Sequence, residues 1–363
     1  MPSAAFLTVD WSPNSDPLSP GGSSWYRCLL PMVELKERGW PAGMGLPGWD
    51  DAHGFGLRQS PEVTIAGWSV VVLKLLMHRD TPEQVRRAQA LGQKVVVDID
   101  DFHADLHPDN VAAKGTDPML NPDVNRQFHE QVIEAADMIT VSTPFLLDYY
   151  AERHPCVRLI RNGIDFTRYS RIRDRAGWQP TIGWVGAIPW RSGDLETLRD
   201  WLPAFIGEHD LRVHHSGHLD DDPEHFWTKT GVKQSRMSTL QAALILDYPT
   251  LFTGFEVGIV PLNDIPFNHA KSTIKGLEYA ASGIPFVAAA TPEYIRLAEL
   301  GIGRVASTPE EWVKHLTDLL DPGVRKREAA TQRALVSREF SMRDRGAEWS
   351  TALEEVLAAP SRP

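Results

Sequence analysis

Three charged residues near position 275 have the spacing needed to do chemistry from one side of a helix. Residues 272–282 carry apolar side chains at helical spacing and end at Gly283, which is typical of a helix stop. Lys271, Lys275 and Glu278 therefore share one face. The first backbone N–H groups of a helix attract anions, so the pattern predicts a phosphate or diphosphate site. A solvated charged face is the alternative.

The segments around this helix predict the elements that position it. Residues 255–262 form an apolar strand, and residues 263–270 form a loop that contains Pro266. Residues 284–290 are continuously apolar, as expected of a strand covered on both faces. This order of strand, loop, helix and strand is typical of an α/β domain.

The motif FN-x-x-KS-x-x-K-x-x-E-Y-x-x-x-GIP-F-V resembles the donor-sugar motif of glycosyltransferases with the two-Rossmann-domain (GT-B) fold. It is most similar to the retaining enzymes of family 4 and their bacterial and phage relatives. The resemblance implies that Glu278 binds the nucleotide ribose. In the family pattern another glutamate stands eight residues earlier, where this chain has Ala270, and Asn268, His269 or Lys271 are candidates to replace its contact to the sugar.

The sequence thus predicts that one stretch binds the diphosphate and ribose of a nucleotide sugar. Its expected donor-binding residues are Asn268, Lys271, Ser272, Thr273, Lys275 and Glu278. A second turn, after a strand at residues 181–185, adds Gly186 and Arg191. A glycine turn lets a phosphate approach backbone N–H groups, and an arginine can neutralise its charge.

Carboxylates end the apolar strand at residues 94–99. Asp98 lies near its end and Asp100 and Asp101 follow it directly, and ligands bind at the C-terminal ends of strands in α/β sheets. The triplet also fits a D-x-D metal site or a cap of the next segment. In the similar family a histidine often stands where Asp100 stands, and these enzymes generally need no metal for chemistry. We expect Asp100 and Asp101 to act at the catalytic site with Lys271, and no metal ligands.

A glycine pair follows the first predicted strand, residues 4–9, and precedes a helix at residues 24–38. The GxGxxG fingerprint is missing, which disfavours a dehydrogenase. The similar families carry a GG-S-x-x-Y-R element here, facing the cleft between the domains. The resemblance places Gly21, Gly22, Tyr26 and Arg27 on the acceptor side; a surface loop is the alternative.

Three histidines, His214, His215 and His218, lie in or beside a predicted strand at residues 211–216. A metal site is one interpretation. Because neighbouring residues of a strand point to opposite faces, we favour ordinary packing and surface positions.

The length of 363 residues suits two domains. The sequence NGID at residues 162–165 is similar to the end of the first domain in glycosyltransferases. We expect an α/β protein of two Rossmann-like, doubly wound domains that face a cleft. The expected ranges are an acceptor domain at residues 1–170, a nucleotide-sugar domain at 171–340, and a C-terminal helix at 341–363 that packs back on the first domain.

The composition bears on nucleic-acid binding, cellular location and membrane insertion. The net charge is −11, which argues against general nucleic-acid binding. Only Cys28 and Cys156 are present, so a reduced, cytoplasmic location is expected. The longest apolar run, residues 70–77, is interrupted by Lys74 and is too short to cross a membrane.

The predicted function is transfer of a glycosyl group from a nucleotide-diphosphate sugar, with retention implied by the resemblance to family 4. The donor is a substrate, and no other cofactor is expected. The acceptor stays open among a glycan, a small molecule, a protein and a modified base. The alternatives are a nucleotide-sugar 2-epimerase of the same fold and a non-catalytic nucleotide-sugar-binding protein.

Overall fold

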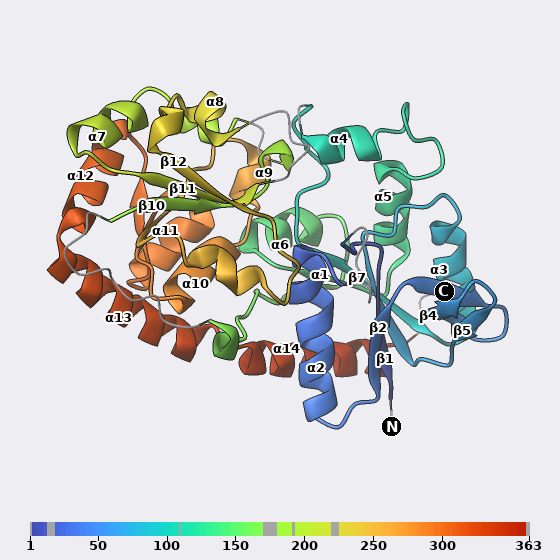
Figure 1. Ribbon diagram of the computed structural model, residues 1–363. Helices are drawn as coiled ribbons and strands as arrows, with labels where there is room; N and C mark the ends of the chain where they lie inside the picture. Colours follow the sequence, from blue (N-terminus) through green and yellow to red (C-terminus); the bar gives the residue numbers. More distant parts are fainter. Residues whose placement is uncertain are drawn as a thin grey trace.

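The chain forms two α/β domains, each built on a six-stranded parallel sheet with helices on both faces (Figure 1). This computed structural model describes residues 2–12, 19–108, 110–169, 180–190, 193–218 and 225–360. The expected fold class, two doubly wound domains, is confirmed. Arg191 and the expected domain boundary at 170/171 lie outside the described residues.

The central strands of the N-terminal sheet are completely buried. Each residue of its three central strands is buried, because their continuous runs of valine, alanine and leucine are covered by helices from both sides. In spatial order the strands are β2 (Ala42–Gly45), β1 (Ala4–Thr8), β6 (Val70–Lys74), β7 (Lys94–Ile99), β8 (Met138–Val141) and β9 (Val157–Leu159).

The helices of this domain begin with an irregular one. A π-helical turn, η1, joins two α-helical segments into one continuous helix, where the sequence predicted a regular helix. Such turns redirect side chains and are frequent at functional sites. The helical elements are α1 (Gly22–Ser24), η1 (Trp25–Leu29), α2 (Leu30–Glu37), α3 (Thr81–Ala90), α4 (Val111–Thr116), α5 (Arg126–Ala135), α6 (Pro144–Ala151) and the 3-10 turn η2 (Phe166–Arg168).

A small antiparallel sheet covers one side of this domain. The sheet consists of β3 (Pro47–Asp50), β4 (Gly54–Ser60) and β5 (Val63–Ile65). Strands β2 and β3 were not predicted, because their glycine-rich sequences have low strand propensity and depend on pairing with β1 and β4.

The C-terminal sheet has the strand order of a Rossmann domain, with its switch point between β10 and β13. In spatial order its strands are β12 (Met237–Gln241), β11 (Val213–His218), β10 (Ile182–Val185), β13 (Val257–Val260), β14 (Phe286–Ala289) and β15 (Arg304–Ala306). The α-helices are α7 (Leu202–Glu208), α8 (Phe226–Thr230), α9 (Pro266–His269), α10 (Ile274–Ala281), α11 (Pro292–Glu299), α12 (Pro309–Leu320) and α13 (Pro322–Glu339). Short 3-10 turns are η3 (Ile188–Trp190), η4 (Leu195–Leu198), η5 (Gln234–Arg236) and η6 (Tyr248–Phe252).

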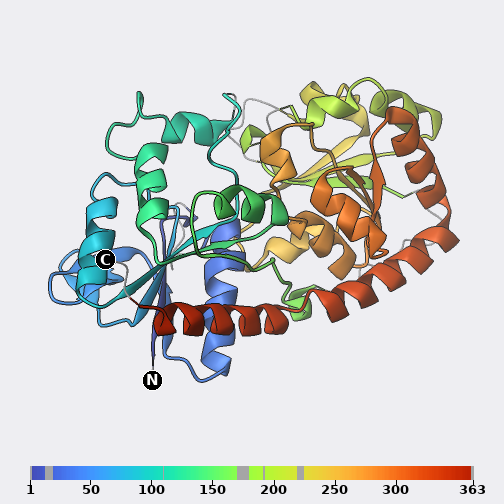
Figure 2. The same cartoon turned by 180° about the vertical axis from the view of Figure 1, so that it is seen from behind.

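The last helix, α14 (Met342–Ala358), returns to the N-terminal domain, as expected. Figure 2 shows α13 and α14 running along one side of the molecule from the second domain to the first. Trp349 is 1% exposed, and its ring packs edge to face against Phe6 at 5.4 Å between centroids. A backbone bridge joins Ile164, in the NGID sequence, to Ser341 at the start of this helix. None of the described helices is long and apolar enough to cross a membrane.

Candidate functional site between the two domains

A cavity of about 400 Å³ lies between the domains, at the C-terminal ends of the strands of both parallel sheets. The N-terminal domain contributes Ser12, Pro20, Gly22, Ser23, Tyr26, Asp100, Asp101 and Asn162 to its lining. The C-terminal domain contributes Ala243, Ile245, Tyr248, Val260, Leu262, Lys271, Ser272, Ile274, Lys275, Glu278 and Tyr294. Residues singled out from both halves of the sequence therefore meet in one place.

Glu278 is the buried carboxylate of the C-terminal wall. It is 2% exposed, so the alternative of a solvated charged face is wrong for this residue. Its Oε1 accepts hydrogen bonds from the hydroxyl groups of Tyr26 and, at 3.4 Å, Tyr169, and its Oε2 accepts one from Tyr248 at 3.2 Å. Three segments distant in sequence thus converge on one carboxylate.

The donors around Glu278 are neutral hydroxyl groups. Burial raises the pKa of Glu278, and the hydrogen bonds from the tyrosines and the charge of Lys275 offset only part of this effect. Burial and the nearby carboxylate also raise the pKa of Tyr26 and of Tyr248 well above the usual value, so both stay protonated donors. The carboxylate is held by groups of the same chemistry as sugar hydroxyls.

Two lysines stand beside Glu278 on the same wall. Lys271 lies in the turn before α10, three residues ahead of its first residue, Ile274, rather than inside the helix. Its Nζ is 3.8 Å from Asp101 of the other domain and 4.1 Å from the centroid of the Phe267 ring. Lys275 Nζ donates to the carbonyl oxygen of the last residue of β10. The wall carries two cations close to a helix start.

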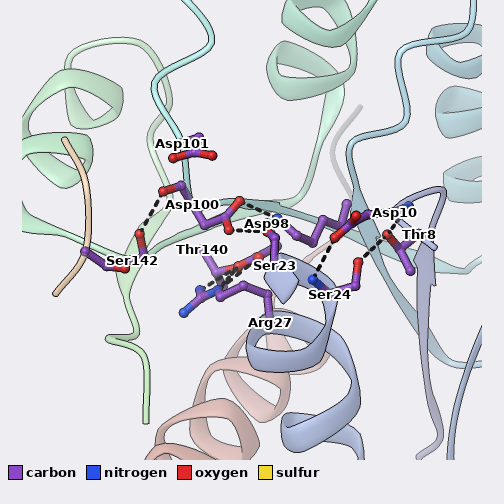
Figure 3. Close-up of polar contacts among 12 residues, drawn as sticks. Thr8, Asp10, Ser23, Ser24, Arg27, Asp98, Asp100, Asp101, Thr140 and Ser142 are labelled. Atoms are coloured by element: carbon purple, nitrogen blue, oxygen red, sulfur yellow. Dashed lines mark hydrogen bonds and ion pairs between the residues drawn. The ribbon is translucent and has the colours of Figure 1, made fainter. Parts of the chain in front are cut away.

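On the opposite wall, Asp100 is fixed by a cation from the neighbouring strand (Figure 3). Lys74, fully buried at the end of β6, donates to Oδ1, and the hydroxyl of Ser23 donates to Oδ2. Burial raises the pKa of Asp100, but the charge and hydrogen bond of Lys74 outweigh it and hold this pKa well below the usual range. Asp100 is therefore an ionised, paired group at the cavity surface near neutral pH.

Asp98 and Arg27 form a buried structural pair rather than a site for ligands. Arg27 is 1% exposed and donates to both oxygens of Asp98, with Thr140 completing the set at 2.7 Å (Figure 3). It also donates to the carbonyl oxygen of Ile160. The expectation that Arg27 faces the acceptor is corrected: the buried charge of Asp98 draws its guanidinium into the domain.

The two glycines of the first loop have different tasks. A Cβ on Gly21 would lie 1.9 Å from Oδ1 of Asp10, so Gly21 allows close packing within the loop. Asp10 in turn accepts from the backbone N–H of Ser24 at 2.9 Å (Figure 3). Gly22 lines the cavity, and a Cβ there would meet nothing within 4 Å. Of the pair, only Gly22 borders the space for a ligand.

Three expected donor-binding residues lie behind the cavity surface. The N–H of Gly186 donates to the carbonyl oxygen of Ser216 at 2.9 Å, so it is already used within the sheet. Asn268 is 1% exposed and its amide donates to Asp194 at 2.7 Å. Thr273 is 3% exposed at the N-cap of α10. Asn268 and Thr273 flank the turn that carries Lys271 and Ser272, Gly186 belongs to the turn after β10, and none of the three lines the cavity.

The position without the family glutamate is a contact between the domains. Ala270 is fully buried and packs in the apolar cluster of the N-terminal domain, and its carbonyl oxygen accepts from the Thr143 hydroxyl at 2.9 Å. A carboxylate at Ala270 would be buried against apolar side chains, which is costly. The departure from the family pattern therefore has a packing reason here.

Sequence reasoning missed several residues that complete the site, chiefly Tyr169 and Tyr248 around Glu278 and Lys74 under Asp100. A signal existed for the lysine, because a lone lysine inside an apolar strand must find a buried carboxylate. No comparable signal marked the tyrosines, since ordinary core tyrosines have the same sequence context.

The metal interpretations find little support in the geometry. Asp98 and Asp100 already face cations, and within the described ranges no group of three His, Cys, Asp or Glu side chains could hold a metal ion. His214 contacts Ser238 at 2.8 Å and His215 contacts the Gly186 carbonyl at 2.9 Å. These separate contacts agree with the packing interpretation of the histidines.

Comparison with known proteins establishes the fold. No protein-family model matches the sequence, and no curated protein sequence matches it. A glycosyltransferase from Rickettsia africae ESF-5 is similar in structure with a TM-score of 0.66 and 10% identity, over 99% of this chain and 100% of that one. Anabaena Alr3699/HepE in complex with UDP-glucose has a TM-score of 0.61 and 13% identity, over 97% and 99%.

The structure of TarM is also similar, with a TM-score of 0.56 and 9% identity, but the match covers 80% of this chain and only 55% of TarM. At such identities the likeness concerns the fold. The resemblance to glycosyltransferases with the GT-B fold is thus confirmed for the architecture, and membership of family 4 stays a prediction.

Proposed function

We propose that the chain is a glycosyltransferase that binds a nucleotide-diphosphate sugar in the cavity between its domains. The main support comes from the C-terminal wall of the cavity. There Lys271 and Lys275 flank the start of α10, and the buried Glu278 lies one turn further on. Cations and helix N–H groups suit a diphosphate, and a carboxylate beyond them suits a ribose. The fold shared with HepE, solved with UDP-glucose, supports the same assignment.

Chemistry at this site requires stabilisation of a leaving diphosphate. As the bond from the sugar to the diphosphate breaks, negative charge grows on the phosphate oxygen. Lys271 and Lys275 lie where they would oppose that charge, and preorganised charges of this kind contribute strongly to catalysis. The transfer adds the glycosyl group to an acceptor that enters from the side of Gly22, Asp100 and Asp101. Retention of the configuration at the anomeric carbon is proposed from the sequence resemblance to family 4.

The ribose is proposed to exchange with the tyrosines at Glu278. An ionised carboxylate accepts about four hydrogen bonds, and three tyrosine hydroxyls already use it in this structure. One ribose hydroxyl can donate to the remaining acceptor position of the carboxylate. The second can replace one of the tyrosine hydroxyls, so the carboxylate keeps all its hydrogen bonds. Donor binding then needs no metal ion at Glu278.

A thermal-shift panel of UDP, GDP, ADP, CMP and dTDP sugars tests the proposal. At least one should raise the melting temperature of the chain, and the Glu278→Gln variant should respond less. No response to any of them contradicts a nucleotide-sugar site. Product analysis with the stabilising donor and no acceptor separates transfer from 2-epimerisation, and binding without turnover on any acceptor indicates a non-catalytic protein.

A further inference from the structure

Three residues of the C-terminal wall are each contacted by a side chain of the N-terminal domain. The pairs are Lys271 with Asp101 at 3.8 Å, Ser272 with Asn162 at 2.9 Å, and Glu278 with Tyr26 at 2.5 Å. All six residues line the cavity between the domains. Of the described donor-binding candidates in this lining, only Lys275 donates within its own domain instead. The N-terminal domain therefore engages most of the proposed donor site.

Two of these contacts have the chemistry of the proposed donor. Asp101 places a carboxylate near Lys271, where the diphosphate is proposed to bind, and both groups are anions that a lysine attracts. Tyr26 places a hydroxyl on Glu278, where the ribose is proposed to donate its own hydroxyls. In this structure, groups of the N-terminal domain that resemble parts of the ligand thus occupy both positions.

A ribose cannot reach Glu278 until one hydroxyl withdraws, because Glu278 is only 2% exposed and both its oxygens accept from tyrosines. Tyr169 does not line the cavity, and Tyr248 belongs to η6 in the same domain as Glu278. Tyr26 lines the cavity and comes from the other domain. Its hydroxyl is therefore the one that a movement between the domains removes.

Tyr26 is held in place by its own domain. It lies in η1 and is 7% exposed, and the neighbouring Arg27 donates to both oxygens of the buried Asp98. A closely packed ring on an anchored turn has little room to rotate. The hydroxyl of Tyr26 therefore leaves Glu278 when the domains separate at this contact, rather than by rotation of the side chain.

We propose that Tyr26 and Asp101 are intramolecular competitors of the donor, and that a nucleotide sugar binds as the two domains separate at this contact. The identity of the ligand rests on the proposed function; the contact between the domains does not. A donor that binds only the separated form has an apparent dissociation constant equal to the intrinsic one divided by the fraction of separated chain. Removing a competitor therefore tightens donor binding, whereas removing an ordinary ligand contact weakens it.

The sign of the change in donor affinity is the first test, measured by calorimetric titration of the full chain. Tyr26→Phe keeps the ring and removes one hydroxyl. It should lower the dissociation constant of the nucleotide sugar that stabilises the chain about threefold or more. Tyr149→Phe, the same substitution in the same domain away from the contact, should leave this constant unchanged. Unchanged or weaker binding in Tyr26→Phe overturns the proposal.

Asp101→Asn keeps the test decisive where Tyr26→Phe disturbs folding, because the Asp101 side chain is 40% exposed. It should also tighten donor binding, since Lys271 loses its partner from the other domain. Asp105→Asn removes the same charge from an exposed residue of the same loop and is the control. Equal tightening in both variants would reflect the charge of the loop alone and would contradict competition at Lys271.

Small-angle X-ray scattering is the second test, because it measures separation of the domains directly. Saturating nucleotide sugar should increase the radius of gyration of the unchanged chain. The double variant Tyr26→Phe/Asp101→Asn should have the larger radius even without ligand, and an unchanged radius overturns the proposal.

The two measurements also separate this inference from the proposed function. A donor that binds without enlarging the chain contradicts the competition and leaves the donor site standing. If no nucleotide sugar binds even to the double variant, the proposed function is contradicted, whereas an enlarged double variant still shows that Tyr26 and Asp101 hold the domains together.

Discussion

The two walls of the cavity between the domains hold their buried carboxylates in different ways. On the N-terminal wall Asp98 is paired with Arg27 and Asp100 with Lys74. On the C-terminal wall Glu278 is held by neutral tyrosine hydroxyls. Removing a cation from a buried carboxylate leaves an unpaired charge, whereas one hydroxyl can replace another at little cost. The N-terminal carboxylates therefore fix the wall, and Glu278 is the one suited to exchange partners with a ligand.

The largest effect on stability is expected from a substitution on the N-terminal wall, where each carboxylate is paired with a cation. Asp98→Asn leaves the buried Arg27 without its counter-charge and should reduce the free energy of unfolding by about 3–5 kcal/mol, measured in urea. Asp123→Asn removes an exposed partner of Arg79 and is the control, with an expected loss below about 1 kcal/mol. A loss at Asp98 no larger than that of the control would show that the two walls do not differ.

Lys271→Ala should have the next largest effect, and on binding rather than on folding. The loss of one charge-assisted contact to the diphosphate should raise the donor dissociation constant tenfold to a few hundredfold, about 1.5–3 kcal/mol. Calorimetric titration with the nucleotide sugar that stabilises the chain measures it. Lys233→Ala, at an exposed position of the same domain, should leave the affinity unchanged. Unchanged affinity in Lys271→Ala would remove this lysine from the donor site.

Glu278→Gln tests the C-terminal wall, where a ligand is expected to replace a tyrosine hydroxyl at the carboxylate. It keeps the shape and one acceptor oxygen but removes the charge, so two ribose hydroxyls lose a charged partner. Donor affinity should fall at least tenfold while the melting temperature stays nearly unchanged, in contrast to Asp98→Asn. A variant that binds the donor normally, or that loses stability instead, would make Glu278 a structural residue.

The smallest effect is expected from chelation. Asp98 and Asp100 are neutralised by side chains of the protein, and the lysines of the opposite wall supply positive charge for the diphosphate. Full transfer activity should therefore persist in excess chelator, in an assay with the identified donor and acceptor. If activity disappears and returns with magnesium or manganese, the D-x-D interpretation of these aspartates is correct.

Local sequence was sufficient for the architecture and for the central motif. The apolar runs at 94–99 and 284–290 predicted strands, and the second was expected to be covered on both faces because it is continuously apolar. The spacing of Lys275 and Glu278 predicted a shared surface, since helical geometry fixes which side chains are neighbours, and Lys271 reaches the same wall from the turn before α10. These features depend on residues close together in the chain.

The partners of each charge were decided only by the tertiary structure. Arg27 and Gly21 belong to a motif that the sequence placed in the cleft, yet Arg27 turns inward to Asp98 and Gly21 packs on Asp10. Nothing near Glu278 in sequence marks Tyr26, Tyr169 or Tyr248 as its donors. Hydrogen-bond partners of buried groups are chosen by which segments the sheets bring together.

The sequence therefore predicted two Rossmann-like domains and a set of donor-binding residues, of which Lys271, Ser272, Lys275 and Glu278 line the cavity. Only the tertiary structure separated Asp98, which stabilises the fold, from Asp100 at the cavity surface and from Glu278, which can exchange its partners. The physical reason is that a carboxylate has the same propensity and the same charge in each of these positions. Its role is set by whether burial supplies it with a cation or with hydroxyl groups, and those partners come from distant parts of the chain.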